Sequence, residues 1–426
     1  MRRLLIIAAT LMAISTKLLA QNDFLSIDKQ TYDYYMNGDY RNLKRTADTM
    51  LSQGMDYYYL RMRLGILSYN NELYSSALKH FNRALEFNSG DTLSREYIYY
   101  SYLFSGRKTD ALLYLETIPW NQKNIALKSL SKTGPTAIFA GSSASGSDVT
   151  LYNSNSLYYE AVKSSLSFNA GFESYFSNNL KGTFAFTNFR KAGTAYSESD
   201  SLGTDLNFSQ NQVYAKLTGY LFPGWEFSGF GHVALYSTTN TVVAGRYGRY
   251  SNSVVAKTEY TVGGGISKNG WKIRAGANIS LSNLGNSNQM RGEGYITWLP
   301  SGNLKLYLTS GGMYQNDINW GKTYQINQEI GLKLSNSLWL ESGIVKGNSF
   351  LYARNQGYAV NNSFQSPATT IYSNIIILPG KHFSITVTPF FTKNDIYSWD
   401  LNDYTRTDKL ITNSFGGSIK LIYKNK

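Results

Sequence analysis

Few side chains in this sequence belong to the types that carry out acid–base, nucleophilic or metal chemistry. There are three histidines and no cysteine, which excludes thiolate nucleophiles, thiolate metal sites and disulfides. His232 falls in a predicted strand close to Glu226, so a hydrolase with a serine–histidine–acid triad is conceivable. No nucleophile motif accompanies the pair, and a lone histidine in a strand is more often structural. The sequence therefore predicts no enzyme, no metal site and no cofactor.

Two glycine-containing motifs raise the question of a phosphate or sugar site. Gly263-Gly264-Gly265 is not followed by a helix, as a phosphate-binding loop would be. Thin side chains inside a barrel, or a bulge, explain it better. The sequence Gly-Arg-Tyr-Gly-Arg-Tyr at Gly245–Tyr250 falls in a polar loop, where cations and rings could contact sugars or an anionic polymer. An ordinary ordered loop is the simpler interpretation.

The elements that would position such groups begin with an export signal. Two arginines precede the apolar run Leu4–Ile14, and Ala20 precedes a polar residue, which predicts a secretory signal peptide over residues 1–20. A short membrane anchor is the alternative, but it needs roughly 20 uninterrupted apolar residues. The formal net charge is +13, and on an exported protein this surplus does not argue for nucleic acid.

Residues 21–121 have helical periodicity, and residues 122–133 are predicted to be a linker. Small residues that permit close helix crossing alternate with aromatic residues that fill the groove between helices: Leu64, Gly65, Tyr74, Ala77, Phe81 and Ala84. This spacing resembles the tetratricopeptide repeat, whose period is about 34 residues. A generic helical bundle with the same core is the alternative. Surplus tyrosines such as those at 57–59 and 99–100 could line a concave binding face.

From residue 134 to 426 the apolar residues recur with a period of two. In Trp271–Leu281 the odd positions are mainly apolar and the even positions polar, which fits a soluble sandwich or a transmembrane barrel. Three features favour the barrel: strands of about ten or more residues, short turns alternating with longer polar stretches, and tryptophans near the short turns. The longer stretches are 190–206, 237–252, 346–366 and 394–410, and the predicted interface girdle is Trp225, Trp271, Trp298 and Trp339, of which Trp339 falls on the polar register.

Six short turns define twelve strands, and segments at both ends add two more. The fold class predicted is therefore helical hairpins followed by a transmembrane antiparallel β-barrel of about fourteen strands, with twelve or sixteen as alternatives. The alternation directs these charged residues into the lumen: Lys181, Lys216, Lys257, Lys272, Arg274, Arg291, Lys305, Lys333, Lys420, Glu173, Glu226, Glu259, Glu293, Glu329 and Glu341. Basic residues outnumber acidic ones, which would modestly favour a permeant anion. Charges that pair across strands and rigidify a closed interior are the favoured alternative.

A signal peptide, tetratricopeptide-type helices and an outer-membrane barrel together resemble exopolysaccharide exporters and the smaller YaiO-like barrel proteins. The resemblance implies a Gram-negative outer-membrane location, a periplasmic helical domain, a periplasmic protein partner and a polysaccharide cargo. It covers the mature chain as an architecture, whereas specific motifs cover only residues 64–85. Two functions follow: an export channel in contact with outer-membrane lipid, or a non-conducting anchor that presents the helical domain to its partner.

Overall fold

The computed structural model describes residues 24–123, 125–128, 134–148, 159–197, 200–244, 249–361, 365–399 and 406–425. The predicted signal peptide lies outside the described residues, as do residues 245–248 of the Gly-Arg-Tyr motif. The chain divides into two compact units, Met1–Ser131 and Lys132–Lys426. None of the helices in the described ranges is long and apolar enough to cross a membrane.

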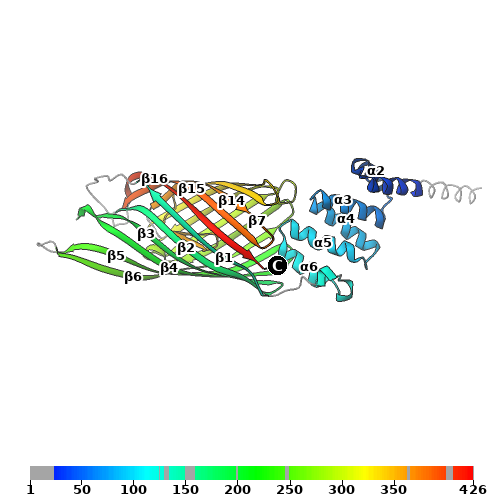
Figure 1. The fold of residues 1–426 in the computed structure, drawn as a ribbon. Coiled ribbons are helices and arrows are strands. Elements are labelled where there is room, and N and C mark those ends of the chain that lie inside the picture. Colours follow the sequence, from blue (N-terminus) through cyan, green and yellow to red (C-terminus); the bar gives the residue numbers. More distant parts are fainter. Residues whose placement is uncertain are drawn as a thin grey trace, which may run out of the picture. The chain divides into compact units, whose positions relative to one another are not determined.

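The first unit is a series of helical hairpins (Figure 1). Residues 24–36 are helical, and the later elements are α2 (Tyr40–Ser52), α3 (Tyr58–Asn70), α4 (Tyr74–Phe87), α5 (Thr92–Phe104), α6 (Lys108–Thr117), the 3-10 turn η1 (Trp120–Gln122) and α7 (Ile125–Lys128). Helices α2, α4 and α6 begin 34 residues apart, and α3 and α5 are separated by the same step. The regular step gives the unit a repeating architecture.

The hairpins pack through small residues and rings. Phe81 and Ala77 are fully buried, and a Cβ added to Gly65 would lie 2.6 Å from the Phe81 ring. Only glycine therefore allows α3 and α4 to approach this closely. The Phe81 ring also stacks on Tyr97 of α5, with centroids 4.8 Å apart, which joins successive hairpins. Of the other predicted packing residues, Leu64, Tyr74 and Ala84 are buried.

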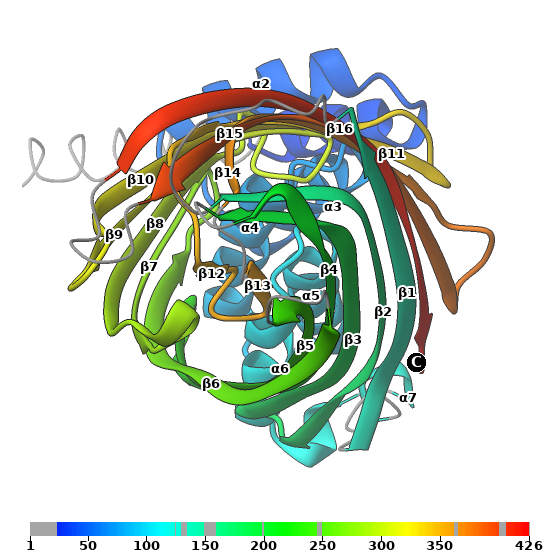
Figure 2. The same ribbon diagram turned by 90° about the vertical axis from the view of Figure 1, so that its left-hand side faces the viewer.

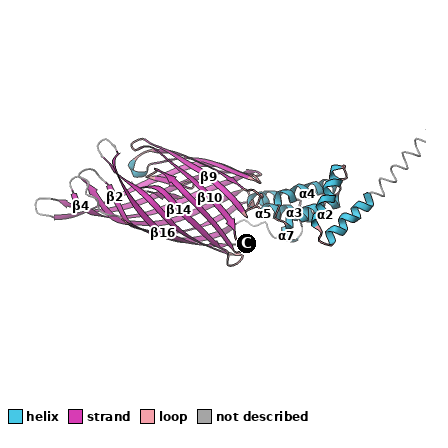
Figure 3. Cartoon of the chain, turned by 90° about the horizontal axis from the view of Figure 1, so that it is seen from above, coloured by secondary structure: helices cyan, strands magenta, loops and turns pink. Residues whose placement is uncertain are grey.

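The second unit is a closed antiparallel barrel of fourteen strands (Figures 1 and 3), which confirms the predicted fold class. The strands are β1 (Gly134–Ser147), β2 (Tyr159–Ser177), β3 (Leu180–Ser197), β4 (Asp200–Phe222), β5 (Trp225–Ala244), β6 (Arg249–Asn269), β7 (Ile273–Ser282), β8 (Gln289–Trp298), β9 (Leu306–Asp317), β10 (Gly321–Lys333), β11 (Leu338–Gly347), β14 (Gln365–Ile377), β15 (Phe383–Trp399) and β16 (Arg406–Lys424). The first and last strands pair from Ala137↔Lys424 to Ser147↔Ser414 and close the wall. A closed wall leaves no strand edge unpaired.

The two faces of the wall differ in polarity. Apolar side chains point outward and stay exposed, for example Leu166 (56%), Ile279 (51%) and Phe415 (62%). The alternate positions point into the lumen and carry mainly polar groups, such as the Ser143–Ser167 hydroxyl pair, 2.8 Å apart. An apolar exterior around a polar interior is the arrangement of a transmembrane barrel.

The strands are long on one side of the barrel and short on the other. β2 to β6 contain 18 to 23 residues each, whereas β7 to β11 contain 10 to 13. About 9–11 residues suffice to cross a bilayer, so only the short side matches that length. Long outer loops were the expectation for 190–206, 237–252 and 394–410, but their described parts are paired strand. Those three predictions are wrong because strand pairing continues into these stretches.

The fourth expected loop, between β11 and β14, folds into the lumen. It contains a small hairpin of β12 (Tyr352–Arg354) and β13 (Ala359–Asn361), paired Tyr352↔Asn361 to Arg354↔Ala359. Figure 2 shows this hairpin inside the ring of strands. We call residues 348–361 the inward loop.

Candidate functional site

The tip of the inward loop is Gln356, which is hydrogen-bonded to several strands of the wall. Its side-chain oxygen accepts from Lys216 Nζ at 3.0 Å, and its side-chain nitrogen donates to Ser228 Oγ at 3.2 Å. Its carbonyl oxygen accepts from the Tyr214 hydroxyl at 3.2 Å, and its N–H donates to Glu293 Oε2 at 3.5 Å. Strands β4, β5 and β8 therefore hold one residue of the loop in place.

The backbone at the tip adopts an uncommon conformation. Asn355, Gln356 and Gly357 have φ of 55°, 56° and 79°, in the left-handed region that costs energy for non-glycine residues. Such a turn persists only when surrounding contacts over-determine it. His232 Nδ1 donates to the Gly357 carbonyl oxygen at 2.6 Å and supplies one of these contacts.

The contacts of His232 also bear on the conceivable catalytic triad. His232 is bonded to the inward loop, whereas Glu226 accepts from Asn269 Nδ2 at 2.7 Å and from Ser267 Oγ at 3.3 Å. No hydrogen bond between His232 and Glu226 occurs in the described part of the chain. The histidine has a structural partner, as a lone strand histidine usually does.

Of the glycines at 263–265, Gly265 makes room for the loop tip and Gly263 makes room for the Phe230 ring. A Cβ at Gly265 would lie 2.9 Å from the side-chain nitrogen of Gln356, and one at Gly263 would lie 2.5 Å from the Phe230 ring. The motif is thus a thin part of the wall inside the barrel, one of the two explanations that the sequence suggested. Larger residues here would displace the loop tip.

The first part of the inward loop, residues 350–353, is anchored by apolar contacts. Phe350, Leu351 and Ala353 form a buried cluster with Leu284 of the turn η2 (Leu284–Asn286), and Trp320 packs against it. The four members of the cluster, without Trp320, are at most 2% exposed. Gln315 Nε2 also donates to the Leu351 carbonyl oxygen at 3.2 Å. The cluster buries apolar side chains that have no lipid to face inside the lumen.

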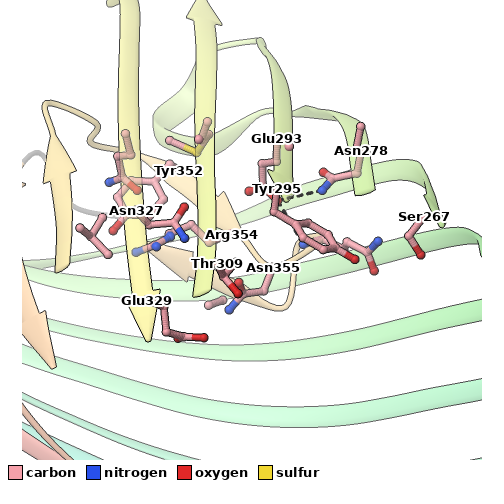
Figure 4. Close-up of a pocket in the computed structure, with 18 of the residues that line it drawn as sticks. Ser267, Asn278, Glu293, Tyr295, Thr309, Asn327, Glu329, Tyr352, Arg354 and Asn355 are labelled. Atoms are coloured by element: carbon pink, nitrogen blue, oxygen red, sulfur yellow. Dashed lines mark hydrogen bonds between the residues drawn. The ribbon is translucent and has the colours of Figure 1, made fainter. Parts of the chain in front are cut away.

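A cavity of about 880 Å³ lies between the inward loop and the short side of the wall. Figure 4 shows side chains from the wall and the loop converging on it, including Glu293, Glu329, Tyr295 and Arg354. Its charged lining consists of three glutamates and two cations: Glu226, Glu293, Glu329, Lys216 and Arg354. Amides and hydroxyls supply most of the remaining polar groups. The lining therefore has no basic surplus.

Three tyrosines, on β8, β9 and β14, lie flat on the lumen wall. Each stands directly opposite a glycine on the neighbouring strand: Tyr295↔Gly276, Tyr307↔Gly331 and Tyr372↔Gly343. A Cβ added to Gly276 would lie 2.5 Å from the Tyr295 ring, and one on Gly343 would lie 2.6 Å from the Tyr372 ring. The glycines thus provide the space that each ring occupies.

Two of the three flat tyrosines, Tyr307 and Tyr372, are held at their hydroxyl ends by glutamates. The Tyr372 hydroxyl donates to Glu329 Oε2 at 2.6 Å, and the Tyr307 hydroxyl donates to Glu341. Glu341 also accepts from Asn374 Nδ2 at 3.0 Å. The ring position is therefore fixed from below by glycine and from the side by a carboxylate.

Strand register places the predicted lumen charges as follows. Those on the inward face of strands are Glu173, Lys181, Lys216, Glu226, Lys257, Glu259, Arg274, Arg291, Glu293, Glu329, Lys333, Glu341 and Lys420. Lys305 directly precedes β9 and is exposed. Lys272 lies in the turn between β6 and β7, directly before β7, so its place on the lumen wall stays a prediction. The turn is longer than the alternation suggested.

Charge pairing in the lumen is mixed. Lys181 bridges to Glu173 on the neighbouring strand at 2.8 Å, and Arg291 lies 3.3 Å from Glu293 on its own strand. Other carboxylates bond to tyrosine, serine or amide donors. Lys420 stands over the Phe139 ring at 4.6 Å. Neither simple cross-strand pairing nor a basic lumen describes the interior.

The predicted tryptophan girdle is found only in part. Trp225 and Trp298 point outward and are 36% and 50% exposed. Trp271 is half-buried in the β6–β7 turn. Trp339 stands opposite Lys333 and lies on the face of Glu341, so it points inward and its place in the girdle is wrong. Its position on the polar register was the sequence signal for this.

Sequence reasoning missed the inward loop and the flat tyrosines. A buried loop has no periodicity, although the apolar pair Phe350-Leu351 within a polar stretch is a signal for it. The tyrosine–glycine pairs depend on cross-strand register, which requires both strands to be aligned. No cluster of three or more potential metal ligands occurs among the described residues.

Comparison with known proteins gives a likeness of fold only. No family model and no curated protein matches this sequence. A TodX mutant described as a monoaromatic hydrocarbon channel matches with a TM-score of 0.47 and 9% identity, over 73% of this chain and 94% of that chain. A FadL homologue of Pseudomonas aeruginosa matches at 0.44 and 8%, over 69% and 90%. A bacterial polysaccharide outer membrane secretin matches at 0.35 and 9%, over 68% and 99%. These values are too low to indicate a function.

Proposed function

We propose that this protein is an outer-membrane channel of an export system, closed at rest by its inward loop. The observation that carries the proposal is a cavity of about 880 Å³ with a largely polar lining, bordered on one side by a loop that enters the lumen from one connection. A loop held by hydrogen bonds and two apolar clusters can leave without disturbing the strand ladder. Opening then exposes a polar interior, which a permanently packed core would not provide.

The direction of the barrel supports a periplasmic helical unit. The two longest connections, β1–β2 and β11–β14, lie at the opposite end from the start of β1 and the end of β16. Longer loops face outward and short turns face the periplasm in barrels of this class, and the helical unit precedes β1. We therefore assign the helical unit to the periplasm.

The helical unit is assigned as a tetratricopeptide-type protein-binding domain. Helix starts at intervals of 34 residues equal the period of that repeat. The close contact of Gly65 with Phe81 is consistent with its packing residues. Its partner in this proposal is a periplasmic component of the same export system, and the cargo is a polysaccharide.

The channel is tested by replacing residues 350–360 with a short Gly-Ser linker and recording current in planar bilayers. We expect the variant to give a steady conductance that the full-length protein lacks. The matched control shortens the β5–β6 hairpin by replacing 241–252 with Asn-Gly, since Asn240 and Ser253 are direct partners. Absence of current in the loop variant would refute the channel, and equal currents in the loop variant and the unaltered protein would refute closure by the loop.

A non-conducting anchor is the second candidate. It is favoured by the hydrogen bonds of Gln356 to three separate strands, because these bonds would hold a permanently fixed loop across the lumen. In that case, the linker variant would remain closed to ions and lose thermal stability.

A further inference from the structure

We propose that the cavity under the inward loop is a binding site for uncharged saccharide, in which Tyr295 and Tyr372 serve as stacking platforms. Both rings line the cavity and both lie flat over a glycine. The inference rests on the proposed function for its cargo class, and it adds the site, the contact residues and the charge of the ligand.

The first argument is the orientation of the rings. A ring that covers a glycine presents one face to the wall and leaves the opposite face toward the lumen. Tyr295 is 40% exposed although it lies on the inward register, so its free face is open to the cavity. Flat aromatic faces bind ring-shaped partners by stacking, without demanding a particular charge. Pyranose rings offer such an apolar face together with hydroxyl edges.

The second argument is the polar lining around the rings. Glu329 accepts from the Tyr372 hydroxyl, and Glu293 accepts from Asn278 Nδ2 at 3.0 Å. Each carboxylate has more acceptor positions than these bonds use. Asn327 and Thr309 add groups that donate and accept. A hydroxyl-rich ligand needs this mixture, whereas a hydrocarbon would leave these groups without partners.

The third argument is charge. Three glutamates and two cations line the cavity, and one of the cations, Lys216, already bonds the loop tip. An anionic polymer would meet carboxylates on several sides, and such contacts are unfavourable. The overall basic surplus of the chain therefore does not extend to this site. The ligand favoured here is uncharged.

The size of the cavity fits a short oligosaccharide. Ligand pockets generally have volumes of about 300–1,000 Å³, and this one has about 880 Å³. The loop forms one side through Tyr352 and Arg354, so a bound saccharide would touch the closing element directly. Binding of the cargo and the position of the loop would therefore be coupled through direct contacts.

The test is equilibrium binding to the purified full-length protein in detergent, measured by calorimetry. The neutral probes are cellotetraose and fully acetylated chitotetraose, and the anionic probe is tetragalacturonate. We expect at least one neutral probe to bind, and tetragalacturonate to bind at least about tenfold more weakly, which equals 1.4 kcal/mol. Each probe is also tested on the linker variant, which leaves the cavity open.

Variants separate the rings from general damage. Tyr295→Leu and Tyr372→Leu should each weaken binding of the neutral probe by about tenfold or more, since each removes a stacking face. Tyr372→Phe keeps the ring and should retain affinity within about threefold. The matched control is Tyr314→Leu, because Tyr314 lies on β9 and points outward with 51% exposure. It should bind like the unaltered protein.

The outcomes distinguish this site from the channel. Failure of both neutral probes on both forms of the protein would overturn the site, as would preference for tetragalacturonate. Equal loss in Tyr314→Leu and Tyr372→Leu would also overturn it. Because no current is needed for calorimetry, saccharide binding without conductance would refute the channel alone. Conductance without binding would refute only the site.

Discussion

The helical unit buries its apolar side chains in its interior, whereas the barrel exposes the same kinds of residue on its outer face. In the helical unit, Leu43, Phe81 and Ile98 are at most 1% exposed. In the barrel, Ile279 and Leu166 are more than half exposed, while lumen positions such as Gln315 are buried. One unit is built to exclude water from its interior, and the other to face lipid. The solvent on each side, not the residue type, decides where an apolar side chain belongs.

The lumen contains two exceptions to this inversion. One is the apolar cluster of the inward loop with Leu284. The other joins Phe139, Tyr214 and Phe230 with Tyr358 of the loop, with the Tyr214 and Tyr358 rings 5.2 Å apart. Both clusters involve the loop. Apolar residues inside the barrel therefore mark where the loop is docked, and they offer the means to release it.

The largest expected effect comes from placing arginine at matched isoleucines. Ile98→Arg buries an unpaired charge among helices and should cost more than about 4 kcal/mol, seen as loss of the helical melting transition by circular dichroism. Ile279→Arg faces lipid and should cost about 2–4 kcal/mol at the middle of the bilayer, seen in folding into liposomes. Each variant should leave the other unit unchanged. A barrel that tolerates Ile279→Arg in liposomes would break the comparison.

A smaller effect is expected from Leu351→Ala in the inward loop. Leu351 is 1% exposed, and its truncation should reduce docking of the loop by about 2–4 kcal/mol. The loop carries Arg354, so faster tryptic cleavage after that residue in detergent-solubilised protein reports the release. Leu235→Ala is the control, since Leu235 is 53% exposed on the outer face. Equal cleavage of both variants would show that the cluster does not hold the loop.

A third pair of changes compares glycines in the two units. Gly65→Ala forces a Cβ against the fully buried Phe81 ring, and we expect a loss of about 1–3 kcal/mol despite the better helix propensity of alanine. Gly292→Ala meets no atom within 4 Å, so the barrel should be unchanged or slightly more stable. Thermal or denaturant unfolding of each unit measures the difference. A stabilised Gly65→Ala protein would mean that the helices can separate without loss.

The sequence predicts those features that depend on periodicity within one element. Alternation along β7 directs Ile279 outward and Arg274 inward, because a strand repeats every two residues. Its proximity to a turn predicts that Trp339 belongs with the outward tryptophans. Strand register instead directs its side chain inward. The inward loop could not be predicted from the sequence, because its docking depends on hydrogen bonds between Gln356 and residues 128 to 142 positions away, including Ser228. Contacts of that kind require the closed barrel first.

The smallest effect is a pH dependence confined to the helical unit. Desolvation, together with the nearby Arg61 guanidinium, lowers the pKa of His80 from 6.5 to about 4. Arg61 Nη1 lies 3.2 Å from His80 Nδ1, so the neutral imidazole accepts this hydrogen bond. Arg61 is also held by Asp56, with Nε–Oδ1 at 2.6 Å. Protonation of His80 would remove the acceptor and place two cations side by side.

The direction of the effect follows from proton binding in the two states. Between pH 6.5 and about 4 the unfolded chain binds a proton at His80 that the folded unit does not, so stability falls as the pH falls through this window. Partial exposure reduces the effect to about 1 kcal/mol, or about 4–8 °C for a domain of this size. His80→Gln keeps an acceptor for Arg61 and should flatten the melting profile between pH 6.5 and 4.5. An unchanged slope in this variant would assign the acid sensitivity to carboxylates such as Asp56, whose pKa is lowered mainly by its bond to Arg61.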